Sequence, residues 1–136
     1  MAARGQGDRY QGMNWIRQDK RLAIYLRDGA ACVWCGQSIE DGVTLTLDHL
    51  TCHAHGGSNA AANLVTACRA CNSRRADRSV EEFAAVVAGY VDHGVSTAAI
   101  LADIAERTAR DLRPYRDEAR EMIARRGSAA RALAAR

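Results

Sequence analysis

The sequence lacks the long apolar runs that would place it in a membrane. No stretch approaches the roughly 18 consecutive apolar residues that a membrane-spanning helix requires, which excludes a span. The basic, glycine-containing N-terminus, residues 1–13, has no apolar stretch of the kind found in secretory signals, and we expect it to be flexible. We therefore expect a cytoplasmic protein, in which thiols stay reduced and paired cysteines favour metal binding over disulfides.

Aromatic residues are also scarce: the 136 residues include one Phe, two Trp and four Tyr, which predicts a mostly aliphatic core. The length fits one domain with a helical appendage. The net charge of +3 is uneven, because residues 1–79 and 113–136 are basic whereas residues 80–112 are acidic. Basic ends around an acidic middle are compatible with a nucleic-acid partner and equally with solvated helix faces.

Four of the five cysteines form two CxxC pairs, Cys32 with Cys35 and Cys68 with Cys71. Two such knuckles at this separation are typical of a four-thiolate, tetrahedral zinc site, and Gly36 supplies the permissive backbone that a knuckle needs. The alternatives are two separate reduced pairs or a redox CxxC, but no thioredoxin-like pattern surrounds either motif. A closed four-thiolate site leaves no position for a substrate, so this zinc would be structural.

The segment between the knuckles predicts a strand, a loop, a second strand and a helix. Apolar residues alternate with threonine over residues 43–47, which indicates a strand that ends at Asp48 and His49. Residues 51–63 have the Gly, Ser and Asn content of a loop. The sequence LVTA then predicts a short strand, and a helix that begins at about the second knuckle would carry Asn72 towards the end of the first strand.

Residues 27–78 resemble the HNH endonuclease family, whose core is the ββα-metal fold. RDGAACVWCG resembles the lead-in to the family's first zinc knuckle, and LDHL with GGSNAAANLVTACRACNSRR resembles its catalytic block. His49 matches the first His of the family name and Asn63 matches the middle Asn. Asn72 matches the third position, where Asn replaces His in an HNN-type variant that the family is known to use.

The resemblance implies a metal-dependent DNA endonuclease. His49 would act as the general base that takes a proton from the attacking water. Asp48 and the side-chain oxygen of Asn72 would hold one divalent ion, Mg²⁺ or Mn²⁺, which suits hard oxygen ligands. Asn63 would organise the loop through hydrogen bonds to its backbone. The implied fold is α+β: a ββα-metal core held together by a four-cysteine zinc site, with flanking helices.

Two positions depart from the family pattern. Cys52 stands where many members have proline, and we expect it to be a buried or half-buried free thiol. His55 stands where Arg or Lys is common, and we assign it, with Arg74, Arg75 and Arg78, to nucleic-acid binding, because Arg forks match phosphate oxygens. The alternative interpretation is an ordinary solvated loop and helix end.

The segments before and after this core are predicted to be helical. Residues 14–79 would form the core with its lead-in helix, capped at Asn14, and residues 80–136 a helical extension. Ser79 and Glu82 form a capping box, which opens a helix that we expect to close at Gly94. Pro114 predicts the start of a last helix, whose tail from residue 125 would fray. Apolar stripes over the extension suit core packing, a homodimer or a partner protein.

Two alternative functions stay open at the level of sequence. One is a non-catalytic zinc-ribbon module that binds nucleic acid, and the other is a nuclease directed at RNA. The combination of Asp48, His49 and Asn72 argues against the first, because a pure binding module has no use for a general base beside a pair of metal ligands.

Overall fold

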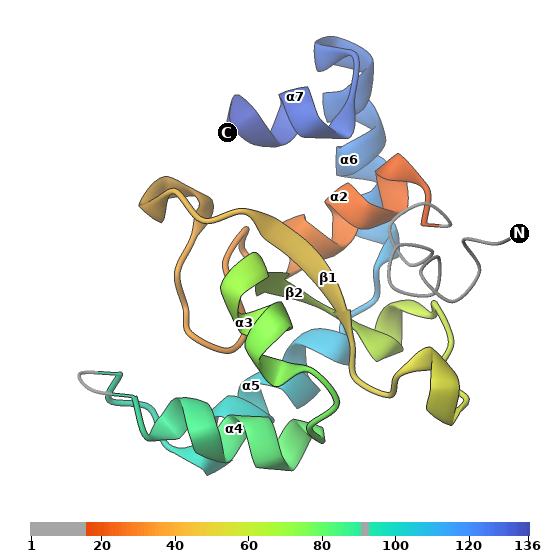
Figure 1. Cartoon of the computed structure of the whole chain (residues 1–136). Coiled ribbons are helices and arrows are strands. Elements are labelled where there is room, and N and C mark those ends of the chain that lie inside the picture. The colour runs from red at the N-terminus through yellow and green to blue at the C-terminus, as the bar shows by residue number, and fades with distance from the viewer. Residues whose placement is uncertain (1–15, 91–92) are drawn as a thin grey trace, which may run out of the picture.

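The computed structural model describes residues 16–90 and 93–136, and these form a two-stranded antiparallel sheet surrounded by six α-helices (Figure 1). The predicted α+β class with a ββα core is confirmed. The strands are β1 (Leu45–His49) and β2 (Leu64–Cys68), and the helices are α2 (Gln18–Arg27), α3 (Arg69–Arg75), α4 (Val80–Ala88), α5 (Thr97–Thr108), α6 (Arg113–Arg126) and α7 (Ala129–Ala134). Short 3₁₀ turns are η1 (Ile39–Asp41), η2 (His53–His55) and η3 (Ala61–Asn63).

The sheet has the strand positions that the alternating pattern predicts, except that β1 begins at Leu45 instead of Val43. The two strands pair in antiparallel register from Leu45 opposite Cys68 to His49 opposite Leu64. Helix α3 follows β2 directly and lies across the sheet (Figure 1). The end of β1 that carries His49 therefore opens into the long loop between the strands.

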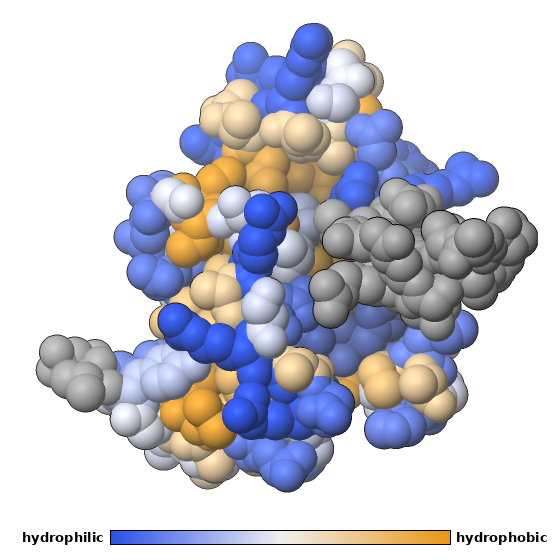
Figure 2. Space-filling view, viewed as in Figure 1, coloured by the Kyte–Doolittle hydropathy of each residue, from blue (hydrophilic) through white to orange (hydrophobic). Residues whose placement is uncertain are grey.

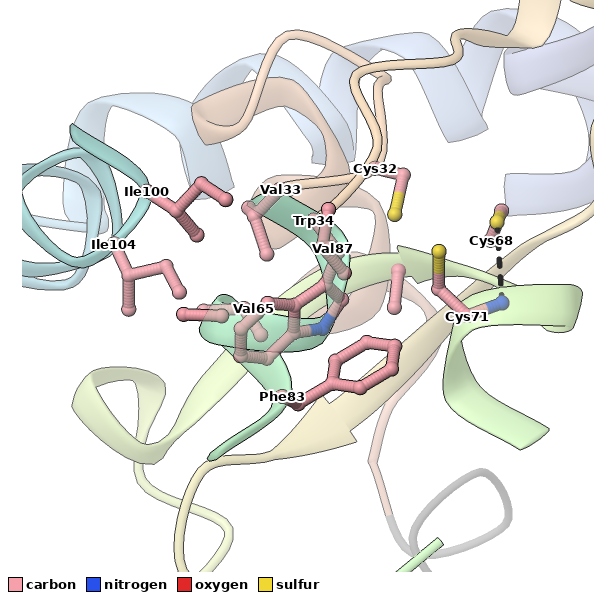
Figure 3. Packing of buried hydrophobic residues seen from close by; sticks show 12 residues of the cluster. Cys32, Val33, Trp34, Val65, Cys68, Cys71, Phe83, Val87, Ile100 and Ile104 are labelled. Carbon is pink, nitrogen blue, oxygen red and sulfur yellow. Dashed lines mark hydrogen bonds between the residues drawn. The ribbon is translucent and has the colours of Figure 1, made fainter. Parts of the chain in front are cut away.

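One hydrophobic cluster joins the cysteine knuckles to α4 and α5. Trp34, between Cys32 and Cys35, meets Phe83 of α4 edge to face, with ring centroids 5.0 Å apart (Figure 3). The predicted capping box at Ser79 and Glu82 is present, with both reciprocal hydrogen bonds. The members of this cluster beyond residue 80 are Phe83, Ala84, Val87, Ile100 and Ile104, which are all buried within the chain.

Helix α4 ends earlier than predicted. Its last residue is Ala88 and its C-cap is Gly89, so the predicted end at Gly94 is wrong. Glycine is a poor helix former, and the N–H of Tyr90 turns back to the carbonyl of Val87, which closes the helix.

The lead-in helix α2 packs against the two C-terminal helices. Leu22 and Ala23 of α2 share a cluster with Ala119 of α6 and with Ala129 and Ala132 of α7. Pro114 lies in the first turn of α6, as predicted. The predicted fraying of the tail is wrong, because the small alanine side chains allow α7 to lie close against α2.

Some expectations fall outside the described part of the chain. The flexible segment 1–13 and the cap at Asn14 belong to this group, while α2 itself begins at Gln18 with Arg17 at its N-cap. The boundary between residues 79 and 80 stays a prediction, as does a dimer or partner contact through residues 80–136. Among the described helices, none combines the length and the apolar character needed to cross a membrane.

Candidate functional site

The four paired cysteines meet at one point, as the CxxC spacing predicts. Their sulfur atoms all lie within 4.8 Å of one another, and the Sγ atoms of Cys35 and Cys68 are 3.8 Å apart. Tetrahedral zinc with Zn–S bonds of about 2.3 Å requires sulfur atoms about 3.8 Å apart, so the set fits such an ion. Figure 3 shows the sulfurs of Cys32, Cys68 and Cys71 gathered beside the Trp34 cluster. These cysteines could hold a metal ion such as zinc.

The local backbone of each knuckle has the geometry of a thiolate site. The N–H of Cys35 points at the sulfur of Cys32, and the N–H of Cys71 points at the sulfur of Cys68. Gly36 has φ +80°, a left-handed conformation that makes use of the permissive backbone predicted there. Hydrogen bonding to Cys32 and burial raise the pKa of Cys35 when no ion is present. A divalent cation is what would make four neighbouring thiolates compatible.

The fifth cysteine does not join this cluster. Cys52 lies at the N-cap of η2 and is exposed, so the expectation of a buried or half-buried thiol is wrong. The η2 turn lies on the surface, and His55, which follows in the same turn, is exposed as well.

The end of β1 is held against α3 by a buried ion pair. One carboxylate oxygen of Asp48 accepts a hydrogen bond from Arg75 at 2.7 Å, and the other accepts one from the indole N–H of Trp34 at 3.1 Å. The side chains of Asp48 and Arg75 are 8% and 6% exposed. Burial raises the pKa of Asp48, whereas the charge and hydrogen bond of Arg75 and the bond from Trp34 act in the opposite direction, and the net shift is upward.

Arg75 was predicted to contact phosphate, but its side chain is buried inside the protein. Besides Asp48, its guanidinium donates to the backbone carbonyls of His49, Leu50 and Arg78. The five N–H groups of an arginine point in fixed directions, and the four hydrogen bonds of this one are all made inside the protein. The assignment of Arg75 to phosphate contact is therefore wrong, because its buried guanidinium holds the strand end against the helix.

The other predicted phosphate contacts are exposed. Arg74 and Arg78 lie on or just after α3, and Arg74 also covers the ring of Tyr90 at 5.8 Å. Arg69, at the start of α3, is exposed as well. Figure 2 shows strongly hydrophilic side chains over α3, on the face turned to the viewer. This face is available to a negatively charged ligand, while its role in binding stays a prediction.

His49 is half-buried and contacts the loop. Its Nε2 atom lies 2.7 Å from the side-chain oxygen of Asn59. The backbone carbonyl of Asn59 in turn accepts a hydrogen bond from Lys20 of α2. His49 and Asp48 are consecutive on β1, and they reach different partners: Asp48 reaches α3, and His49 reaches the loop.

Asn63 connects both sides of the loop. Its amide nitrogen donates to the carbonyls of Thr51 and Ser58, and its side-chain oxygen accepts from the N–H of Thr51. Gly57 packs so closely that an added Cβ would lie 1.7 Å from the carbonyl oxygen of Thr51, which only glycine permits. These contacts agree with the organising role expected of Asn63, whose effect on catalysis stays a prediction.

Asn72 lies in the first turns of α3 and faces β1. Its amide nitrogen donates to the hydroxyl of Thr46 and to the carbonyl of Leu47. Among the described residues, its amide oxygen accepts no hydrogen bond, so it is available to a cation. Each oxygen of Asp48 keeps a lone pair beside its one hydrogen bond. These donors fit a hard divalent ion such as Mg²⁺, although the adjacent Arg75 charge would weaken its binding.

Sequence reasoning missed a second buried arginine next to the site. Arg27 pairs with Asp28 and donates to the carbonyls of Ala61 and Leu64, and the carboxylate of Asp28 accepts the N–H of Thr66. Both side chains of the pair have 0% exposure. The charged dipeptide Arg27-Asp28, a few residues before the first knuckle, was the available signal, but nothing in its sequence distinguishes a buried pair from a surface pair. Asn59, four residues before Asn63, was missed as well.

The comparisons with known proteins agree with the resemblance. Residues 32–85, less than half of the chain, match a family model described as HNH endonuclease. The match begins at the first knuckle and ends within α4, and it supports a nuclease-type enzyme at the level of the family. No curated protein and no solved structure matches the chain.

The cysteine cluster predicts one tightly bound zinc per chain. Elemental analysis of the purified protein should find a 1:1 ratio, and Cys71→Ser should lose both the zinc and the cooperative thermal transition, because affinity for a structural ion is folding free energy. Cys52→Ser is the matched control and should keep both. A folded protein without zinc, or a disulfide at either CxxC, would contradict the assignment.

The buried ion pair predicts that neighbouring arginines of α3 differ in their roles. Arg75→Met leaves the buried Asp48 carboxylate without its charge partner and should lower the free energy of unfolding by about 3–5 kcal/mol. Arg74→Met removes an exposed side chain whose contact is the ring of Tyr90 and should lower the free energy of unfolding much less than Arg75→Met does. Urea denaturation of the zinc-loaded variants, followed by circular dichroism, measures both. Equal stability of the two variants would refute a supporting role for Arg75.

Proposed function

We propose that the chain is a divalent-metal-dependent DNA endonuclease that hydrolyses phosphodiester bonds at the end of β1. The observation that carries the proposal is the arrangement of three side chains on one frame. His49 and Asp48 come from the last two residues of β1, and Asn72 of α3 is hydrogen-bonded to the same strand. The cysteine cluster and the Asp48–Arg75 pair hold this frame together.

His49 is the general base in this proposal. A ring nitrogen of the neutral imidazole takes a proton from a water molecule that attacks the phosphorus. Asn63 fixes the loop in which the partner of His49 lies. Asp48 and Asn72 would hold a single Mg²⁺ or Mn²⁺ ion, which when bound supplies Lewis-acid neutralisation of charge on the phosphate and on the 3′ leaving oxygen.

The exposed face of α3 supplies the phosphate contacts. Arg74 and Arg78 follow Asn72 on the same helix or directly after it, within reach of the backbone next to a bound phosphate. Their guanidinium groups match phosphate oxygens in pairs. His55, exposed in the loop, would contact the bound nucleic acid on the other side of the site. None of these side chains lines a groove suited to contacts with base edges, so we expect low sequence specificity.

The assignment of His49 as the general base predicts that its removal lowers the rate without affecting folding or binding. His49→Ala should lower the rate of plasmid cleavage in Mg²⁺ by about 10²–10⁴-fold, the usual effect of removing a general base. Zinc content, thermal midpoint and DNA affinity should match the wild type, because among the described residues the ring of His49 is hydrogen-bonded to a loop side chain alone. His53→Ala, an exposed histidine of the same loop, serves as the control.

The outcomes of this experiment separate the candidate functions. Cleavage by His49→Ala at the wild-type rate would refute the base. If the wild type binds DNA but never cuts it, the chain is a zinc-ribbon binding module. If it cuts RNA and leaves plasmid and single-stranded DNA intact, the substrate assignment is wrong.

The assignment of Asn72 as a metal ligand predicts a change in the dependence of the rate on Mg²⁺. Asn72→Ala removes one of two protein ligands and should raise the Mg²⁺ concentration needed for half-maximal cleavage, with zinc content unchanged. Titration of Mg²⁺ against the initial rate, for wild type and variant side by side, measures this shift. An unchanged Mg²⁺ curve would show that Asn72 does not hold the ion.

A further inference from the structure

We propose that Asn59 is a positioning residue for His49: it fixes the imidazole in the tautomer that carries its proton on Nε2 and leaves Nδ1 as the basic nitrogen. The contact that carries the proposal is the 2.7 Å separation between Nε2 of His49 and the side-chain oxygen of Asn59. The catalytic consequence rests on the proposed function, whereas the tautomer itself does not.

The tautomer follows from the inventory of donors and acceptors. A neutral imidazole has one N–H and one unprotonated nitrogen, and an amide oxygen can only accept. Nε2 therefore carries the proton in this contact, and Nδ1 keeps its lone pair. The reverse orientation of the amide would put a donor against Nε2 and force the proton onto Nδ1. In the structure it is the amide oxygen that faces Nε2, so the proton is assigned to Nε2 on the geometry of this contact.

Asn59 is itself held from both sides. The carbonyl of the preceding residue, Ser58, accepts a hydrogen bond from Asn63, and the carbonyl of Asn59 accepts one from Lys20. Lys20 belongs to α2, which lies outside the segment that matches the family model. The lead-in helix thus fixes the residue that orients the base, and the imidazole needs no reordering before it acts.

A purely structural role for Asn59 makes different predictions. If it only shaped the loop, its loss would lower thermal stability and weaken DNA binding together with the rate. If it orients His49, its loss should lower kcat by about 10–100-fold, the range seen when the partners that orient metal-ligating histidines are removed, with KM, zinc content and thermal midpoint unchanged. Asn59→Asp retains an acceptor at the same distance and should keep the tautomer.

The decisive test uses NMR of the full zinc-loaded chain labelled with ¹⁵N at histidine. The chain has four histidines, and the signal of His49 is identified by its loss in His49→Gln. The wild type should show a slowly exchanging Nε2–H proton on His49. Asn59→Ala should lose this signal to exchange, and Asn59→Asp should retain it. Ser58→Ala, which removes an exposed side chain from the adjacent position, is the control for both NMR and kinetics.

Two NMR results would overturn the proposal: a proton on Nδ1 of His49 in the wild type, or an Asn59→Ala protein with an unchanged Nε2–H signal. A fall in kcat accompanied by a lower thermal midpoint would also overturn it. The NMR result does not depend on cleavage. A wild type that cuts no nucleic acid therefore refutes the proposed function alone, and an active wild type with an unaffected Asn59→Ala variant refutes this proposal alone.

Discussion

The meeting of four sulfur atoms is the constraint on which the rest of the structure depends. The knuckles are 33 residues apart in sequence, and joining them closes a loop that contains β1, the long loop and β2. An ion that binds all four thiolates would offset the entropy of this closure in one step. Because Cys68 ends β2 and Cys71 lies in α3, the same event fixes the direction of the helix across the sheet.

Two buried arginines then set the position of each strand more finely. Arg27 reaches the start of β2 and Arg75 reaches the end of β1, and each combines a carboxylate partner with backbone carbonyl acceptors. Buried ion pairs add little stability over apolar groups of the same size, but a guanidinium without partners would be costly. Any slip in register would leave donors unpaired, so these contacts favour one alignment of the site over its alternatives.

Short-range patterns made much of this fold predictable from sequence. The CxxC spacing, the alternation before Asp48 and the capping box at Ser79 each depend on neighbouring residues, and each agrees with the structure. The placement of Arg75 could not be predicted, because Arg74, Arg75 and Arg78 look alike in sequence. Only the direction of α3 over the sheet decides which of them faces Asp48. The same reasoning applies to Asn59, a turn residue by composition whose partner lies ten residues away in β1.

The side chains of the last two residues of β1 are held by different parts of the structure. Asp48 is fixed by α3 and Trp34, and His49 is fixed by the loop through Asn59, although the two residues are adjacent. The side chains of Asp48 and His49, the proposed ion ligand and the proposed base, are therefore held by separate contacts, one set tied to the cysteine cluster and the other to α2 through Lys20. Changes in the loop would alter how the His49 side chain is oriented, whereas changes in α3 would affect both residues, because Arg75 also donates to the backbone carbonyl of His49. Only the first set of contacts lies wholly within the segment that matches the family model, because the second includes the contact that Lys20 of α2 makes with the carbonyl of Asn59.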